Sequence, residues 1–187
     1  MKLHLVNGVN NMVVRYKELP WKYVEVDDFL PTDVFNSLLK YCKDLGVDTP
    51  VERTLTVDIE DKPLRNSINE VANELFNSTY KELDTEGKIR YKHNIHFHLQ
   101  FREPHHNYPL HTDISDKLYT IVLYIYPEVA DGTPLYNSNK DYHSTIEWAQ
   151  NRAMAFCPVQ TKGSETFHAV TNNSDANRAA LVINYMK

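Results

Sequence analysis

Several features are scarce in this 187-residue sequence, and each scarcity argues against a class of protein. The only two cysteines, Cys42 and Cys157, lie far apart in apolar surroundings, which favours reduced core thiols over a disulfide framework or a thiol catalyst. No run approaches the roughly 20 apolar residues of a membrane span, and the N-terminal segment lacks the apolar centre of a secretory signal. We therefore expect a cytoplasmic protein with no membrane partner.

Basic residues are also in deficit, because 20 Lys and Arg face 25 Asp and Glu, for a formal net charge of −5. Nucleic-acid binding usually appears as a basic excess, so we expect no nucleic-acid partner. Glycine occurs five times, and no repeat, low-complexity tract or Pro/Gly/Ser-rich linker divides the chain. The length of the chain and the absence of such divisions predict one domain over residues 1–187 with a buried core. They do not indicate an oligomeric state.

The N-terminal part predicts one strand and two helices. The strand covers 23–26, where apolar and polar residues alternate. The first helix follows it, with Thr32 as its N-cap and Gly46 as its end. The second helix covers 63–84, with a proline in its first turn and one apolar stripe along its length. Such apolar faces require a sheet to cover.

From residue 89 onward, the sequence changes to short β-like runs separated by turn residues. About seven strands in one hundred residues predict an antiparallel sandwich, barrel or jelly roll. We therefore expect a mainly β protein with flanking N-terminal helices. The predicted strands are 89–102, 118–126, 133–137, 143–147, 153–157, 165–170 and 178–186.

Four residues form a pattern with chemical meaning. His111 and Asp113 are two positions apart, so an extended backbone points both to one face. His168 can supply a second imidazole, and two imidazoles with one carboxylate form the facial triad of non-haem Fe(II) oxygenases. Zinc favours a closed tetrahedral set or three ligands with one water. Arg178 follows His168 by ten positions, and its guanidinium offers a fork for a carboxylate such as the far end of a keto-dicarboxylate.

This ordered pattern in a β-rich body resembles the 2-oxoglutarate- and Fe(II)-dependent dioxygenases, in particular their prolyl-4-hydroxylase-like branch. The resemblance covers nearly the whole chain. It includes the N-terminal "YVEVDDFLPTDVFNSLLKYC", the metal-binding turn "PLHTD", the strand pair "RAMAFCP" and "ETFHAV", and the closing strand "NRAALVINYM". It implies a double-stranded β-helix (jelly roll) packed against two helices. Residues 1–88 would support the sheet, and residues 89–187 would form the core.

The resemblance also implies a role for six residues. Arg178 would anchor the distal carboxylate of 2-oxoglutarate, and Tyr124 would place its hydroxyl on the same carboxylate. Thr120 shares a strand face with Tyr124 and is a further candidate for this anchor. The expected catalytic iron ligands are His111, Asp113 and His168.

The sequence departs from the family pattern at three places. Glycine is scarce, and the family's Gly-Gly turn is reduced to Gly132-Thr133 in "DGTPLY". Relatives often have Ser or Thr soon after the anchoring Arg, whereas Ala179 and Ala180 follow it here. Relatives also often have a Tyr facing the site on the strand before the metal turn, and the nearest equivalent by count is Phe101. Whether this strand turns its polar or its apolar face toward the site is left open.

The resemblance implies an oxygenase that uses Fe(II), 2-oxoglutarate and O₂, with ascorbate as a further candidate cofactor. Its expected reaction is hydroxylation of a C–H bond, with release of succinate and CO₂. The expected partner is a prolyl residue in a peptide, an amino acid or another small molecule. One alternative is a cupin-like metal protein that does not use 2-oxoglutarate, although such a protein has no need for Arg178. The other is a non-catalytic jelly-roll binding domain.

A few further residues are expected to have no direct role in the chemistry. His105 and His106 lie beside prolines, which favours a position at the rim of the site. Asp116 and Lys117 are predicted to form a solvated turn. The two tryptophans, Trp21 and Trp148, are more typical of core positions than of a substrate platform.

Overall fold

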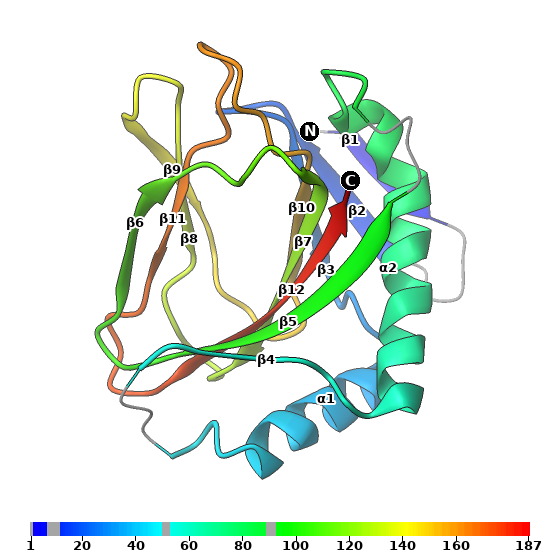
Figure 1. The fold of residues 1–187 in the computed structure, drawn as a ribbon, viewed down its shortest axis with the longest axis vertical. Helices are drawn as coiled ribbons and strands as arrows, with labels where there is room; N and C mark the ends of the chain where they lie inside the picture. The colour runs from blue at the N-terminus through cyan, green and yellow to red at the C-terminus, as the bar shows by residue number, and fades with distance from the viewer. Residues whose placement is uncertain (1, 7–11, 50–52, 89–92) are drawn as a thin grey trace.

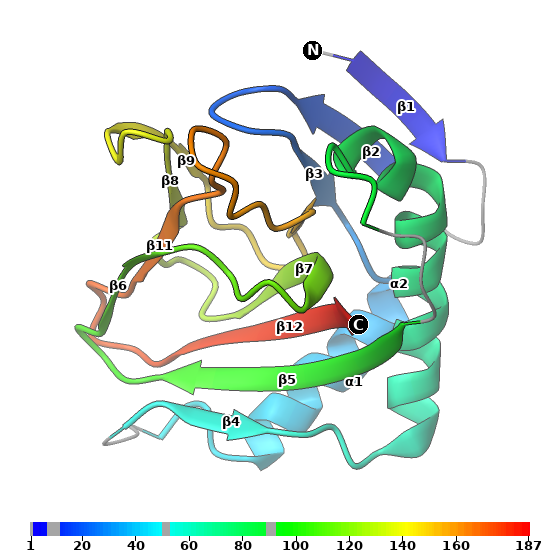
Figure 2. The ribbon, with the colours of Figure 1, turned by 45° about the horizontal axis from the view of Figure 1, so that its top comes forward.

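The computed structural model describes residues 2–6, 12–49, 53–88 and 93–187. Within these ranges, two antiparallel sheets face each other, and two helices cover the outer side of the larger sheet (Figures 1 and 2). The larger sheet contains, in spatial order, β1 (Lys2–Val6), β2 (Met12–Lys17), β3 (Tyr23–Asp27), β10 (Ala153–Phe156), β7 (Lys117–Tyr126), β12 (Arg178–Met186), β5 (Asn94–Arg102) and β4 (Leu55–Val57). The smaller sheet contains β6 (Asn107–His111), β11 (His168–Thr171), β8 (Thr133–Tyr136) and β9 (Tyr142–Ile146).

This arrangement confirms the expected jelly roll with helices on one side. Each strand predicted from residue 89 onward is present, with boundaries that differ by up to a few residues. The predicted strand at 89–102 begins at Asn94, and its residues 89–92 lie outside the described ranges. The strands β1, β2, β4 and β6 were not expected. Three of them extend the larger sheet, and β6 carries part of the site described below.

The two helices, α1 (Thr32–Asp44) and α2 (Lys62–Leu83), begin and end for local reasons. The prediction of Thr32 as the N-cap is wrong, because the non-helical boundary residue is Pro31, which has no side-chain donor or acceptor. Gly46 ends α1 with a positive φ of 84°, which glycine adopts readily. Asp61 caps α2 by accepting a hydrogen bond from the Leu64 N–H at 3.0 Å. Neither described helix combines the length and the apolarity needed to cross a membrane.

A large apolar core fills the space between the helices and the larger sheet. Phe97, Leu99 and Phe101 of β5 are buried in this core. Cys42 and Cys157 also lie there as free thiols, which confirms the prediction of reduced core cysteines. Burial raises the pKa of the Cys42 thiol to about 12, so the thiol is protonated and unreactive at neutral pH.

The burial of the apolar face of β5 settles which face of this strand points to the other sheet. Successive side chains alternate between the two faces of a strand. Because Phe101 packs toward the helices, Gln100 and Arg102 point into the space between the sheets, where both line a pocket. The positions of β5 that face the site beside Phe101 are therefore taken by Gln100 and Arg102.

A second, smaller apolar cluster lies between the two sheets. Its members are Trp21, Tyr23, Tyr124, Leu135, Ile146, Met154 and Phe156. Trp148 packs against it and is partly buried. Both tryptophans therefore have the packing role expected of them, and Trp148 has an additional contact that is described below. Met154 belongs to this cluster and also lines the pocket between the sheets.

Candidate metal centre and anion pocket

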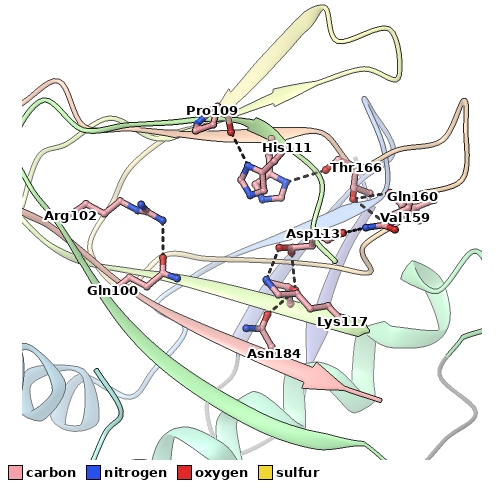
Figure 3. A network of polar contacts seen from close by, with 12 residues as sticks. Gln100, Arg102, Pro109, His111, Asp113, Lys117, Val159, Gln160, Thr166 and Asn184 are labelled. Atoms are coloured by element: carbon pink, nitrogen blue, oxygen red, sulfur yellow. Dashed lines mark hydrogen bonds and ion pairs between the residues drawn. The ribbon is translucent and has the colours of Figure 1, made fainter. Parts of the chain in front are cut away.

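Strand pairing in the smaller sheet brings two histidines together. His111 ends β6, His168 begins β11, and these two residues are register partners. Their ring centroids are 4.4 Å apart. Asp113 lies two positions beyond His111, and candidate ligand atoms of all three residues lie within 4.8 Å of one another (Figure 3). The convergence predicted from the sequence is therefore present.

Hydrogen bonds to the main chain fix both imidazole rings. The Nδ1 atom of His111 lies 2.9 Å from the Pro109 carbonyl oxygen, and that of His168 lies 3.0 Å from the Thr166 carbonyl oxygen. Because a carbonyl only accepts, each Nδ1 is the donor, and each Nε2 keeps a free lone pair. Burial lowers the pKa of His168, an effect that Asp113 opposes and His111 reinforces. Both rings are thus arranged as metal ligands usually are.

Three side chains hold Asp113 in place. The Lys117 ammonium lies 2.5 Å from Oδ1. The Thr120 hydroxyl lies 3.3 Å from Oδ2 and 3.1 Å from Oδ1 of Asn184. Gln160 donates to the main-chain carbonyl of Asp113 (Figure 3). Asp113 is 7% exposed. The negative charge of its carboxylate is compensated by Lys117, and these contacts fix its orientation.

The prediction that Lys117 belongs to a solvated turn is wrong. Lys117 begins β7, and its side chain pairs with Asp113. The register between β7 and β12 shifts between Tyr185 and Met186, and Met186 is the partner of Lys117. Strand alternation counted from Thr120 therefore does not predict the direction of Lys117. Asp116 is exposed, as expected.

The three converging residues line a pocket of about 480 Å³ between the two sheets. This volume is in the range of small-molecule sites. The larger sheet contributes polar and charged side chains as well as apolar ones, and the smaller sheet contributes the histidines. The apolar part of the wall consists of residues such as Val122, Met154, Ala180 and Val182. The pocket is therefore a mixed cavity with the candidate metal ligands on one side.

Arg178 is a buried cation in this pocket. It is 3% exposed, and its Nε and Nη2 atoms have no hydrogen-bond partner among the described residues. Its guanidinium carbon lies 4.8 Å from the Trp148 ring centroid and 5.5 Å from that of Tyr124. Burial lowers its pKa to about 10, an effect that Arg102 reinforces and Tyr124 and Asp131 oppose. A buried guanidinium with unpaired donors is unfavourable by itself, so this position fits an anionic ligand.

A hydroxyl that the sequence analysis missed lies in the pocket together with Arg178. The Tyr124 hydroxyl donates to Thr133 Oγ1 at 2.6 Å, and Thr133 lines the pocket. The Tyr124 ring stacks on Trp148, with centroids 4.5 Å apart. Thr133 is therefore the hydroxyl that can donate into the pocket, while Tyr124 holds it from behind. Its one sequence signal was the Gly132–Thr133 pair, where the family pattern has a glycine-rich turn.

Gly132 determines where Thr133 lies. A Cβ atom at Gly132 would be 2.0 Å from the Ile146 carbonyl oxygen on β9, which is far inside van der Waals contact. The close approach of β8 to β9 therefore requires glycine at this position.

The structure separates Thr120 from the other expected anchor residues. Thr120 contacts Asp113 and Asn184, whereas Tyr124 contacts Thr133 and packs near Arg178. Four strand positions correspond to about 13 Å at about 3.3 Å per residue. Thr120 consequently lies at the metal-ligand end of the pocket.

The fold is a double-stranded β-helix, with three candidate metal ligands on one side of the pocket between its sheets. No family model and no curated protein matches the sequence. Solved structures do match, and the fold is that of prolyl-4-hydroxylase-like 2-oxoglutarate/Fe(II) oxygenases. This finding confirms the family resemblance at the level of the fold.

Three of these structures illustrate the likeness. A viral collagen prolyl hydroxylase from Paramecium bursaria Chlorella virus-1, in a 2-oxoglutarate complex, has a TM-score of 0.62 at 17% identity, over 88% of this chain and 96% of that one. A Pseudomonas putida prolyl-4-hydroxylase has a TM-score of 0.59 at 15% identity, over 88% and 92%. A Trichoplax adhaerens prolyl hydroxylase, in complex with a hypoxia-inducible-factor peptide fragment, has 0.61 at 15% identity, over 88% and 83%.

Proposed function

We propose that this protein is an Fe(II)- and 2-oxoglutarate-dependent oxygenase that hydroxylates an aliphatic C–H bond. One observation carries the proposal. The unpaired, buried Arg178 guanidinium lines the same pocket as the His111–Asp113–His168 group. Two neutral imidazoles and one carboxylate favour non-haem iron, and the guanidinium fits the distal carboxylate of a co-substrate.

The donor set fits ferrous iron, with one Nε2 from each histidine and one carboxylate oxygen from Asp113. Lys117 and Thr120 orient that carboxylate, which is a common role for groups behind a metal ligand. Arg178 and Thr133 bind the distal carboxylate of 2-oxoglutarate, with the Tyr124 hydroxyl holding Thr133. We assign Thr120 to the metal-ligand end because its contacts lie there.

Bound Fe(II), with 2-oxoglutarate and O₂, supplies the oxidising chemistry, and succinate and CO₂ are the co-products. The residues of the chain provide binding, orientation and exclusion of water. Val122, Met154 and Val182 give the pocket an apolar wall against which an aliphatic substrate can pack. Ascorbate is proposed as an accessory reductant that keeps the iron ferrous.

The substrate proposed from the fold is a prolyl residue in a peptide, a free amino acid or another small molecule. Support for a peptide comes from the likeness to the Trichoplax enzyme bound to a peptide fragment. A cupin-like metal protein without an anionic co-substrate is disfavoured, because it would leave Arg178 buried without a partner. A non-catalytic binding domain is disfavoured because it has no need for three converging, hydrogen-bonded ligand residues.

Turnover of 2-oxoglutarate tests the proposed function. Purified protein supplied with Fe(II), 2-oxoglutarate and O₂ should form succinate, even slowly and without a second substrate. The variant Asp113→Ala should lose this activity and its iron while keeping its fold. The matched variant Asp116→Ala removes an exposed carboxylate three positions away and should behave like the parent. Absence of succinate from iron-loaded parent protein, or parent-like turnover by Asp113→Ala, would contradict the proposal.

A further inference from the structure

A second arginine lines the pocket, and the proposed function does not use it. Arg102 ends β5 and is the register partner of Arg178 on the neighbouring strand. Figure 3 shows its guanidinium to the left of His111, joined to Gln100 by a hydrogen bond. Nη2 donates to Gln100 Oε1 at 3.1 Å, and the guanidinium carbon lies 5.1 Å from the Tyr108 ring centroid.

A chain of hydrogen bonds holds Arg102 in this position. Nη1 of Arg102 lies 3.0 Å from Nε2 of His106, and Nδ1 of His106 lies 2.7 Å from Oε1 of Glu103. Arginine can only donate, so Nε2 accepts and Nδ1 donates to the carboxylate. Thr54 donates to the other oxygen of Glu103 at 3.0 Å. His106 is therefore part of a support for Arg102, although the sequence favoured a simple rim position.

This support orients the guanidinium without neutralising it by direct contact. The His106 imidazole separates Arg102 from Glu103, and no carboxylate among the described residues lies within ion-pair distance of Arg102. The charged lining of the described pocket consists of Arg102, Arg178 and Lys117 against Asp113. The charges of Fe(II) and 2-oxoglutarate cancel, so the loaded pocket keeps an excess of positive charge. It therefore still fits an anion.

We propose that Arg102 binds a carboxylate of the substrate, so that the molecule to be hydroxylated is an acidic compound. This inference rests on the proposed function and narrows its substrate class. The exposed apolar side chains of Tyr108 and Ile114 stand at the same pocket and can pack against the aliphatic part of such a substrate. A small amino acid with a free carboxylate, or a peptide with an acidic residue beside the target, has the required chemistry.

Binding to the loaded but inactive protein tests this inference. Mn(II) and saturating 2-oxoglutarate are added under anaerobic conditions, and isothermal titration calorimetry measures the affinity for matched acid and amide probes. The free-carboxylate pairs are L-proline with L-prolinamide and N-acetyl-L-proline with its amide. The side-chain pair is the blocked dipeptide Asp-Pro with blocked Asn-Pro. The first two pairs test a free carboxylate on a small amino acid. The third pair tests the side-chain carboxylate of an acidic residue beside the target proline.

We expect the acid of at least one pair to bind at least about tenfold more tightly than its amide. Arg102→Gln should remove this preference while changing the affinity for 2-oxoglutarate by less than about threefold. Arg102→Lys keeps the charge without the fork and should retain part of the preference. The control His105→Asn changes the neighbouring exposed histidine, whose positive φ of 57° suits asparagine, and should match the parent.

Three results would overturn the inference and leave the proposed function standing. The first is an equal affinity for acid and amide in every pair, and the second is an acid preference that survives in Arg102→Gln. The third is a loss of 2-oxoglutarate binding in Arg102→Gln as large as that caused by changing Arg178, which would assign Arg102 to the co-substrate. Failure of the parent protein to bind Mn(II) and 2-oxoglutarate would instead overturn the proposed function, and this inference with it.

Discussion

Arg102 and Arg178 occupy directly paired positions on β5 and β12, and both line one pocket. Like charges at opposed positions of neighbouring strands destabilise a sheet. Neither guanidinium contacts a carboxylate among the described residues, and burial lowers the pKa of each arginine. Under the proposed function, we expect anion binding to recover the free energy lost to this pairing, so that the empty pocket lowers stability while raising affinity for anions.

This trade predicts opposite effects of one substitution on stability and on binding. Arg178→Met replaces an unpaired buried cation with an apolar side chain that can pack on Trp148 and Tyr124. In the absence of 2-oxoglutarate, we expect the free energy of unfolding to rise by about 1–4 kcal/mol, as measured by urea denaturation. The affinity for 2-oxoglutarate should fall at least about 30-fold, because a buried charge-assisted pair is lost.

Arg152→Met is the matched control for Arg178→Met. The Nε atom of Arg152 lies 2.5 Å from Oδ1 of Asp27, and its Nη1 donates to the Glu147 carbonyl. This variant should lower stability and leave 2-oxoglutarate binding unchanged. A lower stability of the empty Arg178→Met protein would show that the guanidinium is already satisfied without a ligand.

The second half of the carboxylate anchor is tested by a pair of hydroxyl deletions. Thr133 lines the pocket and accepts from Tyr124. Thr133→Val should therefore weaken 2-oxoglutarate binding by about tenfold, the effect of one hydrogen bond to a charged group. Tyr124→Phe should have a smaller effect, because its hydroxyl acts through Thr133. Titration of the metal-loaded protein measures both, and a larger effect of Tyr124→Phe would mean that Tyr124 contacts the carboxylate itself.

Orientation of Asp113 by Thr120 is tested through metal affinity. Thr120→Val removes the hydroxyl near Oδ2 while keeping the shape of the side chain. Loss of a group that supports a metal ligand typically lowers metal affinity about 10- to 100-fold, and we expect this for Mn(II) followed by calorimetry. Thr120→Ser keeps the hydroxyl and should bind Mn(II) like the parent. Equal Mn(II) affinity of the valine and serine variants would remove Thr120 from the site.

The close approach at Gly132 predicts a steric effect on stability. A Cβ atom there would collide with the Ile146 carbonyl oxygen, so Gly132→Ala should lower the free energy of unfolding by about 1–3 kcal/mol. It should also displace Thr133 and weaken 2-oxoglutarate binding. Gly163 has a positive φ of 89° but open space around it, so Gly163→Asn is strained in its backbone alone and should lower stability in urea denaturation by less than Gly132→Ala. Equal stability of the two variants would be inconsistent with the collision.

The sequence predicted the features that depend on local pattern. Strands β5, β7 and β12 were predicted because their sequences have long β-rich patterns. The His-x-Asp spacing, combined with the distal His168, identified three residues that do converge. Strand β6 was missed because its segment, residues 107–111, contains Pro109 and has an exposed surface. Such a segment lacks the apolar alternation from which strands are predicted.

Features that depend on pairing between distant segments could not be predicted. Arg102 lies opposite Arg178 only because β5 pairs with β12 in one particular register. Lys117 reaches Asp113 because the register between β7 and β12 shifts beside it. Thr133 replaces Tyr124 at the pocket wall because β8 approaches β9 across Gly132. In each case the direction of a side chain depends on how its strand pairs with another strand.

The most direct test of the central proposal is the visible absorption of the protein after anaerobic addition of Fe(II) and 2-oxoglutarate. We predict a charge-transfer band that appears only when both are present and that is lost in Asp113→Ala and Arg178→Met. Folded protein that binds Fe(II) at the His111–Asp113–His168 group but shows no such band with saturating 2-oxoglutarate would contradict the account.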